Sequence, residues 1–490
     1  MCNQKNTLHH YDVVIVGAGI ADCSIARELS AYNLSVAVLE RSYDVASGAT
    51  RSNSGIVHGG YDPLPGTKKS YYNIKGKEEF SRLSKELGFR YQERGTLLIA
   101  LNEDELNGLD ELYERGSSLG IKGLKKLSPK EVLTLEPKLN PEVKGAMLCE
   151  SAGICDPFGM CVAYAENAAL NGVDFYFEHE LCKASKNSQG SFELLCTNDA
   201  CFNASLVINC AGVHADKVAA LFGDHSFEIH AVAGEYLVFD RVLEREFQHT
   251  IFMVPSKLGK GVLVTPTVEG NILVGPNAYE REDKLDLATH AASLQEMLSK
   301  AQELTWPALS RKYIIQNFCG LRPKPREGGD FIIGASAHVE GLYHIAAFES
   351  PGLTAAPAVA LELAFEIAQK LEALPRQDFI AHRKQTPRFI ELSDEERKRM
   401  IEQDPNYAHI VCRCEQVTEA EILACMQGPL PVYSIEAIKR RCRAGTGRCQ
   451  GGFCAPVIAE LIASKRGCSI QEVLRAGSST ELAPYKRGRN

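Results

Sequence analysis

The stretch YDVVIVGAGIADCSIARELS (residues 11–30), followed by LSVAVLERS (34–42), decides the fold of the first part of this chain. The apolar run Val13 to Val16 predicts a strand that is covered on both faces. A glycine turn follows, then apolar residues at helical spacing, then a second apolar run that ends at Glu40. Strand, turn, helix, strand and acid in this order predict the β-α-β unit of a dinucleotide-binding domain.

Each part of this unit has a physical task. Gly17 and Gly19 let the backbone approach a pyrophosphate at the start of the helix, and Glu40, next to Arg41, binds the ribose hydroxyls. The third glycine of the pattern falls at position 22, where this chain has Asp22. A carboxylate there faces the anionic pyrophosphate and weakens flavin binding, or it turns to solvent and stabilises the helix N-terminus. The sequence leaves both readings open.

Length and composition set the class of protein. The chain has 490 residues, 45% of them hydrophobic and 24% charged, so we expect a soluble protein of two or three domains. A formal charge of −8 argues against nucleic acid as a partner. No apolar run is long enough for a transmembrane segment, and a strand beginning at Tyr11 leaves no room for a signal peptide. We therefore expect a cytoplasmic protein, with its 17 cysteines mostly reduced.

Four cysteines near the C-terminus are grouped as metal ligands. The pairs are C-x-C and C-x4-C, with Gly445, Gly447, Gly451 and Gly452 in the loops around them. Such loops fold tightly and direct N–H groups at sulfur, which favours a [2Fe–2S] cluster. A structural zinc site is the alternative, although zinc ribbons favour two C-x2-C pairs. The predicted ligands are Cys412, Cys414, Cys449 and Cys454, while Cys425 and Cys442 are expected to be dispensable.

Two parts of the chain resemble known families. Residues 408–465 resemble the ferredoxin-like domain of bacterioferritin-associated ferredoxins. Residues 10–370 resemble the glycerol-3-phosphate dehydrogenase and L-2-hydroxyglutarate dehydrogenase group of the D-amino-acid-oxidase-like flavoproteins, in particular the FAD subunit type of anaerobic glycerol-3-phosphate dehydrogenase. The blocks that carry this second resemblance are DVASGATRSNSGIVHGGYD (44–62), LVINCAGVHAD (206–216), GEYLVFD (234–240), GLRPKPREGGDFIIG (320–334) and FESPGLTAAPAVA (348–360).

The second resemblance implies FAD as the cofactor and assigns residues to it. A helix start at the ESPGLT segment would place N–H groups where they stabilise negative charge on the reduced flavin. One departure is Ala347, where the family tends to have glycine. The implied flavin contacts are Ser52, Asn53, Ser54, Gly212, Ser350, Gly352, Leu353 and Thr354.

Two residues are the candidates for chemistry. Arg322 is expected to anchor a small anionic substrate because a guanidinium grips carboxylate or phosphate at two points. Lys324 and Arg326 either assist it or form a solvated charge run. His58 is the candidate base, since imidazole titrates near neutrality, and a hydrogen bond to the flavin is its alternative role. Glu235 and Tyr236 either line the pocket or only pack.

The predicted architecture is α/β, with a Rossmann-type FAD-binding domain, an antiparallel-sheet substrate domain and a small α-rich C-terminal [2Fe–2S] domain. We expect an oxidoreductase over residues 10–375, a connector over 376–405, the cluster domain over 406–470 and a tail over 471–490. The favoured reaction is FAD-dependent oxidation of sn-glycerol 3-phosphate, with electrons passing through the cluster to a second redox or flavoprotein subunit. Oxidation of a 2-hydroxy acid or amino acid, or a non-catalytic role in a flavoprotein complex, are the alternatives.

Overall fold

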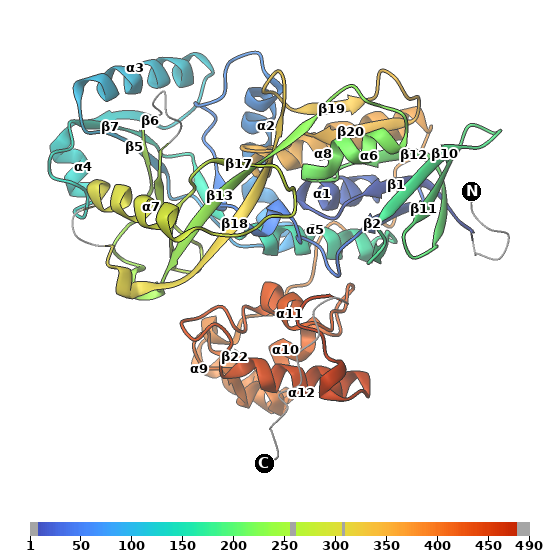
Figure 1. The fold of residues 1–490 in the computed structure, drawn as a ribbon. Helices are drawn as coiled ribbons and strands as arrows, with labels where there is room; N and C mark the ends of the chain where they lie inside the picture. Colours follow the sequence, from blue (N-terminus) through green and yellow to red (C-terminus); the bar gives the residue numbers. More distant parts are fainter. Residues whose placement is uncertain (1–7, 255–260, 306–308, 478–490) are drawn as a thin grey trace.

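The computed structural model describes residues 8–254, 261–305 and 309–477. Two large sheets and their helices form one unit, which we call the body (residues 8–375), and a small helical domain lies beneath it (Figure 1). We call residues 389–477 the C-terminal domain. Among the described residues, no helix combines the length and apolar character that crossing a bilayer requires.

The first sheet of the body is built around the β-α-β unit. Its parallel core runs β9-β2-β1-β12-β20, and β10, β11 and β19 extend it by antiparallel pairing. Val13 and Ile15 pack on one face and Val14 and Val16 on the other, which confirms a strand covered on both faces. The strands are β1 (Leu8–Val16), β2 (Val36–Glu40), β9 (Asp174–Phe177), β10 (Leu181–Lys186), β11 (Phe192–Cys196), β12 (Cys201–Asn209), β19 (Ile332–Ala335) and β20 (Leu342–Ala346).

Five helices and several short elements complete this half of the body. Helices α1, α5 and α8 contribute to one apolar core against the sheet, α2 packs on α8, and α6 packs on the opposite face. The helices are α1 (Ile20–Leu29), α2 (Lys68–Leu87), α5 (Pro157–Leu170), α6 (Ala215–Leu221) and α8 (Gly352–Lys370). The short elements are the 3-10 turns η1 (Ala49–Arg51) and η2 (Gly212–His214) and the small sheet β3 (Ile56–Val57), β8 (Gly153–Cys155) and β4 (Tyr91–Gln92).

The second sheet is antiparallel except for one pair. Strands β5 and β14 run parallel, which the expectation of a purely antiparallel substrate domain did not include. Strand β18 pairs along the whole of β13. The strands are β5 (Thr96–Ala100), β6 (Leu124–Leu127), β7 (Gly145–Cys149), β13 (Ile229–Phe239), β14 (Thr250–Met253), β15 (Leu263–Pro266), β16 (Ile272–Gly275), β17 (Tyr279–Arg281) and β18 (Ile314–Pro325). The helical elements are α3 (Glu103–Ser118), α4 (Pro129–Leu135), η3 (Arg241–Leu243), α7 (Ala291–Leu304) and η4 (Arg311–Tyr313).

The C-terminal domain has its own small apolar core. Its elements are η5 (Phe389–Glu391), α9 (Asp394–Gln403), η6 (Pro405–Ala408), β21 (Ile410–Cys412), β22 (Val417–Thr418), α10 (Glu419–Cys425), α11 (Ile435–Cys442), α12 (Cys454–Arg466) and η7 (Ile470–Glu472). Of the predicted tail, residues 478–490 lie outside the described residues.

The predicted connector divides between the two units. Ile380 N–H donates to Asn171 Oδ1 at 2.8 Å, so the first half of the connector lies on the body. Phe389 N–H donates to Glu421 Oε1 at 3.2 Å, and the Phe389 ring stacks on Tyr407 with centroids 5.9 Å apart. The second half of the connector therefore packs with the C-terminal domain.

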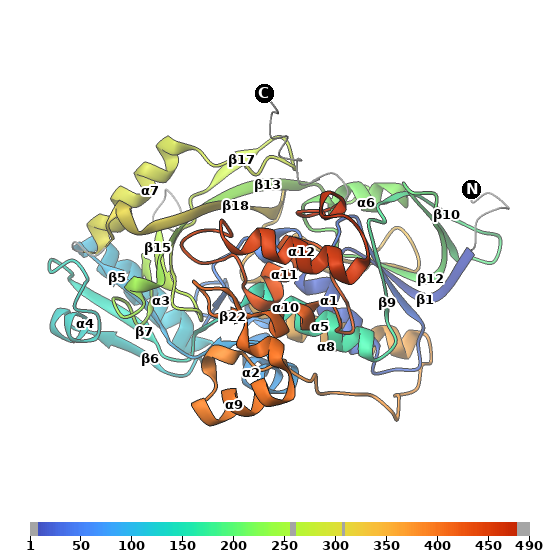
Figure 2. The ribbon, with the colours of Figure 1, turned by 90° about the horizontal axis from the view of Figure 1, so that it is seen from below.

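The C-terminal domain lies against the body (Figure 2), and ion pairs join the two. Asp44 Oδ2, fully buried, accepts from Arg440 Nη2 at 2.7 Å and from Arg441 Nη1 at 2.8 Å. Burial opposes ionisation of Asp44, but the two guanidinium groups prevail and hold the pKa of this carboxyl below its usual value. We call the contact surface between the C-terminal domain and the body the seam. Its body carboxylates are Asp44, Glu166, Asp240 and Glu269, and its arginines are Arg440, Arg441, Arg443 and Arg448.

Candidate functional site

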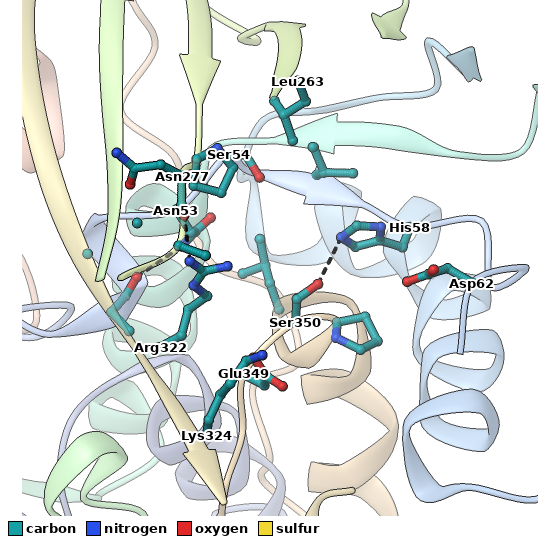
Figure 3. Close-up of a pocket in the computed structure, with 18 of the residues that line it drawn as sticks. Asn53, Ser54, His58, Asp62, Leu263, Asn277, Arg322, Lys324, Glu349 and Ser350 are labelled. Carbon is teal, nitrogen blue, oxygen red and sulfur yellow. Dashed lines mark hydrogen bonds between the residues drawn. The ribbon is translucent and has the colours of Figure 1, made fainter. Parts of the chain in front are cut away.

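A cavity of about 880 Å³ lies between the face of β13 and β18, the start of α8 and the loop after η1 (Figure 3). Its size is typical of sites for small ligands and cofactors. Gly320 of β18 brings that loop close, because a Cβ atom at this position would meet Ser52 O at 2.0 Å. Of the residues predicted from the sequence, the cavity is lined by Ser52, Asn53, Ser54, His58, Arg322, Ser350 and Leu353.

His58 follows strand β3 and faces the start of α8. Its backbone N–H donates to Thr354 Oγ1 at 3.0 Å, and its Nε2 lies 3.3 Å from Ser350 Oγ. Asp62 of the same loop also lines the cavity near His58 (Figure 3). The imidazole is thus held by two elements far apart in sequence, with Nε2 on the cavity side.

Arg322 and Lys324 share the cavity face of β18 because side chains two residues apart on a strand point the same way. Arg322 Nη2 donates to Asn277 O at 2.6 Å and to Ala233 O at 3.0 Å. Backbone carbonyls therefore hold the guanidinium in place. Of its two terminal nitrogens, Nη1 remains available to bind a ligand. Arg326 lies elsewhere, in an exposed pair with Glu228 at 2.6 Å.

Several charged residues that line the cavity were not predicted from the sequence. Lys69 Nζ pairs with Glu349 Oε1 at 2.8 Å, and Lys300 with Glu296 at 2.7 Å. Of the four cavity cations, Arg322 and Lys324 are the two that pair with no carboxylate in the described residues, and Asp62 and Asp330 also line the cavity. The signal for Lys69 was weak but present, since Thr67 in PGTKKS is the N-cap of α2 and places Lys69 in its first turn.

Glu235 and Tyr236 point to opposite faces of β13. Tyr236 lines the cavity, burial raises its pKa to about 12, and its ring stacks on Phe318 with centroids 4.8 Å apart. Glu235 is fully buried on the other face, where Asn277 Nδ2 donates to its Oε2 at 2.7 Å and His290 N–H to its Oε1 at 3.0 Å. Tyr236 belongs to the site, and Glu235 supports the strand behind it.

The remaining residues predicted to bind the cofactor lie outside this cavity. Glu40 Oε2 accepts from Ala18 N–H at 2.8 Å, which ties the end of β2 to the glycine turn. Gly212 has a φ of 56°, a left-handed conformation that favours glycine, at the turn after β12. The other members of this group are Gly17 and Gly19 in the first turn, Arg41 after β2, and Gly352 and Thr354 at the start of α8.

Asp22 is buried in the glycine turn, with 2% of its surface exposed, so the reading that it turns to solvent is wrong. Its Oδ2 accepts from Gly19 N–H at 2.8 Å, whereas its Oδ1 has no hydrogen-bond partner in the described residues. A Cβ atom at Gly17 would lie 2.3 Å from this Oδ1. Burial, and then the charge of Glu40, raise the pKa of Asp22 well above its usual value.

Ala347 does not line the cavity. It is fully buried, and its φ of 53° falls in the left-handed region that favours glycine. The side chain belongs to a small core with Ala215, Ile229 and Ala346. The departure from the family pattern at this position therefore affects the backbone rather than the cavity surface.

The four predicted metal ligands lie on two short segments of the C-terminal domain, from the end of β21 and up to the start of α12, and form two pairs. Cys414 Sγ is 3.7 Å from Cys449 Sγ, and the Cys412 and Cys454 thiols are hydrogen-bonded to each other. This second contact lowers the pKa of Cys412 to about 6. Gly447 is required beside the first pair, since a Cβ atom there would meet Cys414 Cβ at 2.3 Å.

Backbone N–H groups converge on these sulfurs. Gly445 and Glu415 direct N–H groups at Cys412, while Phe453, Gly451 and Gly452 direct theirs at Cys449. Burial opposes ionisation of Cys449, but these donors and the Cys414 thiol lower its pKa. Loops of this kind stabilise thiolates as ligands.

The arrangement of the four sulfurs as two pairs distinguishes a zinc site from a [2Fe–2S] cluster site. A single tetrahedral zinc with bonds of about 2.3 Å needs all four sulfurs about 3.8 Å apart. In the described residues, no group of three or more His, Cys, Asp or Glu side chains is arranged to hold one metal ion. Two separate thiol pairs fit the two irons of a [2Fe–2S] cluster, each of which takes two cysteines. Cys425 and Cys442 bond instead to the backbone carbonyls of Glu421 and Ile438.

The sequence profile described as FAD dependent oxidoreductase matches residues 12–366, nearly the whole body. The chain belongs to this family. A second profile, described as BFD-like [2Fe-2S] binding domain, matches residues 410–464 and includes all four cysteines. The predicted fold class, enzyme class and cofactors are thereby confirmed.

Known relatives agree with this assignment. A glycerol 3-phosphate dehydrogenase from Caloramator mitchellensis is 40% identical over 466 residues, 94% of this chain and 96% of the relative. An L-2-hydroxyglutarate dehydrogenase from Indibacter alkaliphilus is 28% identical over 310 residues, 61% of this chain and 75% of the relative. The structure of dithionite-reduced L-alpha-glycerophosphate oxidase from Mycoplasma pneumoniae with FAD bound matches with a TM-score of 0.74 and 31% identity, over 78% of this chain and 100% of that one.

The described residues can accommodate FAD, and the space is narrow only at the glycine turn. The cavity has room for the flavin ring, and the Glu40 oxygens keep lone pairs for ribose hydroxyls. At the glycine turn, Asp22 occupies space that a third glycine would leave open. The unpaired Asp22 Oδ1 fits a pyrophosphate only when the carboxyl is protonated and donates, because two anions there would repel each other.

Proposed function

We propose that this oxidoreductase oxidises the secondary alcohol of sn-glycerol 3-phosphate and delivers the electrons to a partner protein. Bound FAD would accept the hydride, and the [2Fe–2S] cluster would carry the electrons away singly. The observation that supports the substrate is the arrangement of one cavity, with His58 and Ser350 on one side and Arg322 and Lys324 on the other (Figure 3).

The side chains divide the work. Arg322 Nη1 and Lys324 Nζ would bind the phosphate, whose double negative charge suits two cations. His58 Nε2 would accept the hydroxyl proton, with the substrate hydroxyl taking the place of Ser350 Oγ, which lies 3.3 Å from this nitrogen. The N-terminus of α8 faces the cavity through Ser350 and Leu353 and would stabilise negative charge on the reduced flavin. Ser52, Asn53 and Ser54 would lie along the ring.

Other residues hold the cofactors in this proposal. Gly17, Gly19, Glu40, Arg41 and Gly212 would bind the nucleotide half of FAD, and Gly352 and Thr354 would form the start of α8 beside the flavin. Cys412, Cys414, Cys449 and Cys454 would ligate the cluster.

Oxidation of a 2-hydroxy acid is the second candidate. The specific observation in its favour is that Arg322 offers the cavity one nitrogen, Nη1, which serves a carboxylate as well as a phosphate. A relative named L-2-hydroxyglutarate dehydrogenase also covers 61% of this chain. Because Lys324 is a second cation beside Arg322, our proposal favours a phosphate over a carboxylate as the bound group.

We place the protein in the cytoplasm. The described cysteines are free thiols except Cys201, which is disulfide-bonded, and free thiols persist in a reducing compartment.

Anaerobic bleaching of the flavin tests the function. We expect sn-glycerol 3-phosphate to bleach the flavin absorbance of the holoenzyme in a single turnover, ahead of L-2-hydroxyglutarate and of amino acids. Bleaching by L-2-hydroxyglutarate alone would establish the second candidate. If no member of the panel bleaches a flavin that dithionite reduces normally, the chain is a non-catalytic subunit and the proposal fails.

A further inference from the structure

Phe453 is the most exposed of the large apolar side chains in the described residues, at 83%. It precedes Cys454 directly, and its backbone N–H points at Cys449, so its main chain is fixed while its ring stands in solvent. Cys414 is exposed beside it in the same group of sulfurs. A rigidly held apolar ring where the cluster ligands reach the surface is typical of the centre of an interface.

Three arginines near these sulfurs have exposed side chains, namely Arg241, Arg413 and Arg448. Arg413 precedes Cys414 and is exposed, and no carboxylate in the described residues pairs with it. The Arg448 side chain is 69% exposed and that of Arg241 is 40% exposed, whereas their partners Asp240 and Glu415 are 11% and 2% exposed. The acids are thus covered, and the guanidinium groups face solvent.

The basic surface continues onto the body. Asp240 N–H donates to Tyr313 O at 2.8 Å, and the exposed Lys312 lies over the Tyr313 ring at 4.8 Å. We call the combined surface the cluster rim, and its members are Arg241, Lys312, Arg413, Arg448 and Phe453. This positive surface belongs to a chain whose formal charge is −8.

We propose that the cluster rim is the docking surface for a one-electron acceptor protein whose redox centre is surrounded by carboxylates. The inference deepens the proposed function, on which it rests for the source of the electrons. One substrate molecule gives two electrons and two protons, so two acceptor molecules, each carrying one electron away, dock in turn. Opposite charge steers the encounter and sets the orientation, and the Phe453 ring supplies the apolar centre of the contact.

The haem domain of cytochrome b5, an acidic one-electron acceptor, is a suitable probe, with the basic cytochrome c as its counterpart. We expect the intact protein to bind cytochrome b5 in isothermal titration at low salt, with affinity falling as salt is raised. Charged contacts at the protein surface weaken once the Debye length shrinks below about 10 Å. Cytochrome c is expected to bind much more weakly.

Two rim variants have matched controls. Phe453→Ala should weaken cytochrome b5 binding about tenfold, while Phe365→Ala removes another exposed ring, 54% exposed on α8, without effect. Arg413→Glu should slow association about tenfold at low salt and little at high salt, while Arg466→Glu, at the opposite end of α12, should not. Iron and sulfide are measured in each variant first. If Phe453→Ala loses its cluster, Arg413→Glu carries the test.

The docking proposal can be tested independently of the substrate. Stopped-flow mixing of dithionite-reduced protein with cytochrome b5 measures electron delivery without any substrate, so failure of glycerol 3-phosphate to bleach the flavin leaves this experiment intact. Equal binding by rim variants and controls, or tighter binding of cytochrome c, would overturn the proposal. So would a dimer in sedimentation that Phe453→Ala dissociates, since the rim would then bind a second copy of this chain.

Discussion

The cavity of the body draws its side chains from many segments between Ile20 and Leu353, whereas the sulfurs of the C-terminal domain come from two loops between Cys412 and Cys454. In the cavity, charges are held by groups that are distant in the sequence, since Lys69 is held by the Glu349 carboxylate and Arg322 by the backbone oxygens of Ala233 and Asn277. In the cluster loops, sulfurs are held by backbone N–H groups. Specificity for a substrate thus depends on long-range packing, and specificity for a metal cluster depends on local loop geometry.

The sharpest test of this contrast removes one local ligand. Cys449→Ser should lower iron and sulfide from about two each per chain to near zero, because each iron takes two cysteines. Flavin content and single-turnover bleaching should stay unchanged, while steady-state electron delivery to an acceptor protein collapses. Metal analysis of anaerobically purified protein measures the loss. Cys442→Ser is the control, and loss of the cluster from that variant instead would show that the ligands are misassigned.

The next largest effect concerns the seam that joins the two regions. Asp44→Ala leaves Arg440 and Arg441 buried without their main counter-charge, which costs about 3–5 kcal/mol. We expect the C-terminal domain to separate from the body, seen as faster hydrogen exchange in α11. Asp394→Ala, which breaks a pair whose acid is 95% exposed, should change nothing. Unchanged exchange in Asp44→Ala would mean that apolar contacts hold the seam.

The third effect is a pH dependence at the edge of the seam. Burial raises the pKa of Asp156, the N-cap of α5, from 3.8 to about 6. The folded chain therefore binds this proton more tightly than the unfolded chain. The resulting stability is present below pH 4 and is lost as the pH rises through 6, by about 3 kcal/mol in all.

Asp156→Asn keeps the cap and removes the titration. Between pH 4 and 7 the thermal midpoint of the wild type should fall relative to that of the variant, so the variant should be the more stable protein at pH 7. If the thermal midpoints of the two proteins changed with pH in parallel across this range, Asp156 would have an ordinary pKa.

A smaller effect is expected at the glycine turn. Asp22→Gly removes a buried carboxyl with an unpaired oxygen and should tighten FAD binding about tenfold or more, since such a group costs about 1–3 kcal/mol. Fluorescence titration of the deflavinated protein with FAD measures the dissociation constant. Asp22→Asn separates charge from size, because it keeps the side-chain volume. Equal constants in all three proteins would mean that the turn accommodates Asp22 at no cost.

The smallest effect is expected inside the cavity. Arg322→Lys keeps the charge but loses the donations to Ala233 O and Asn277 O, so the half-saturating concentration of glycerol 3-phosphate should rise about tenfold. FAD content should not change. Arg326→Lys, in an exposed pair with Glu228, is the control. An unaltered half-saturation value in Arg322→Lys would place Arg322 outside the substrate contacts.

The sequence predicted the local features well. The β-α-β unit could be predicted because its strands, turn and helix follow one another between Leu8 and Glu40. The cysteine loops could be predicted because the cysteines within each sequence pair, C-x-C and C-x4-C, are close together. Asn277 was missed because it reaches the cavity through tertiary packing alone, and Lys69 because its place in the first turn of α2 was only a weak signal. The two interpretations of Asp22 could not be separated either, since Cys210, which follows β12, meets the glycine turn beside Asp22 only in the folded chain.

The Asp44–Arg441 pair joins residues 397 positions apart in the chain. At about 5–20 residues per second, a ribosome needs roughly 20–80 seconds to make the second partner after the first. Throughout that interval Asp44 is a solvated carboxylate beside the newly formed nucleotide-binding unit. The body ends at residue 375, so it is synthesised in full before either arginine of this contact, and the seam is the last contact to form.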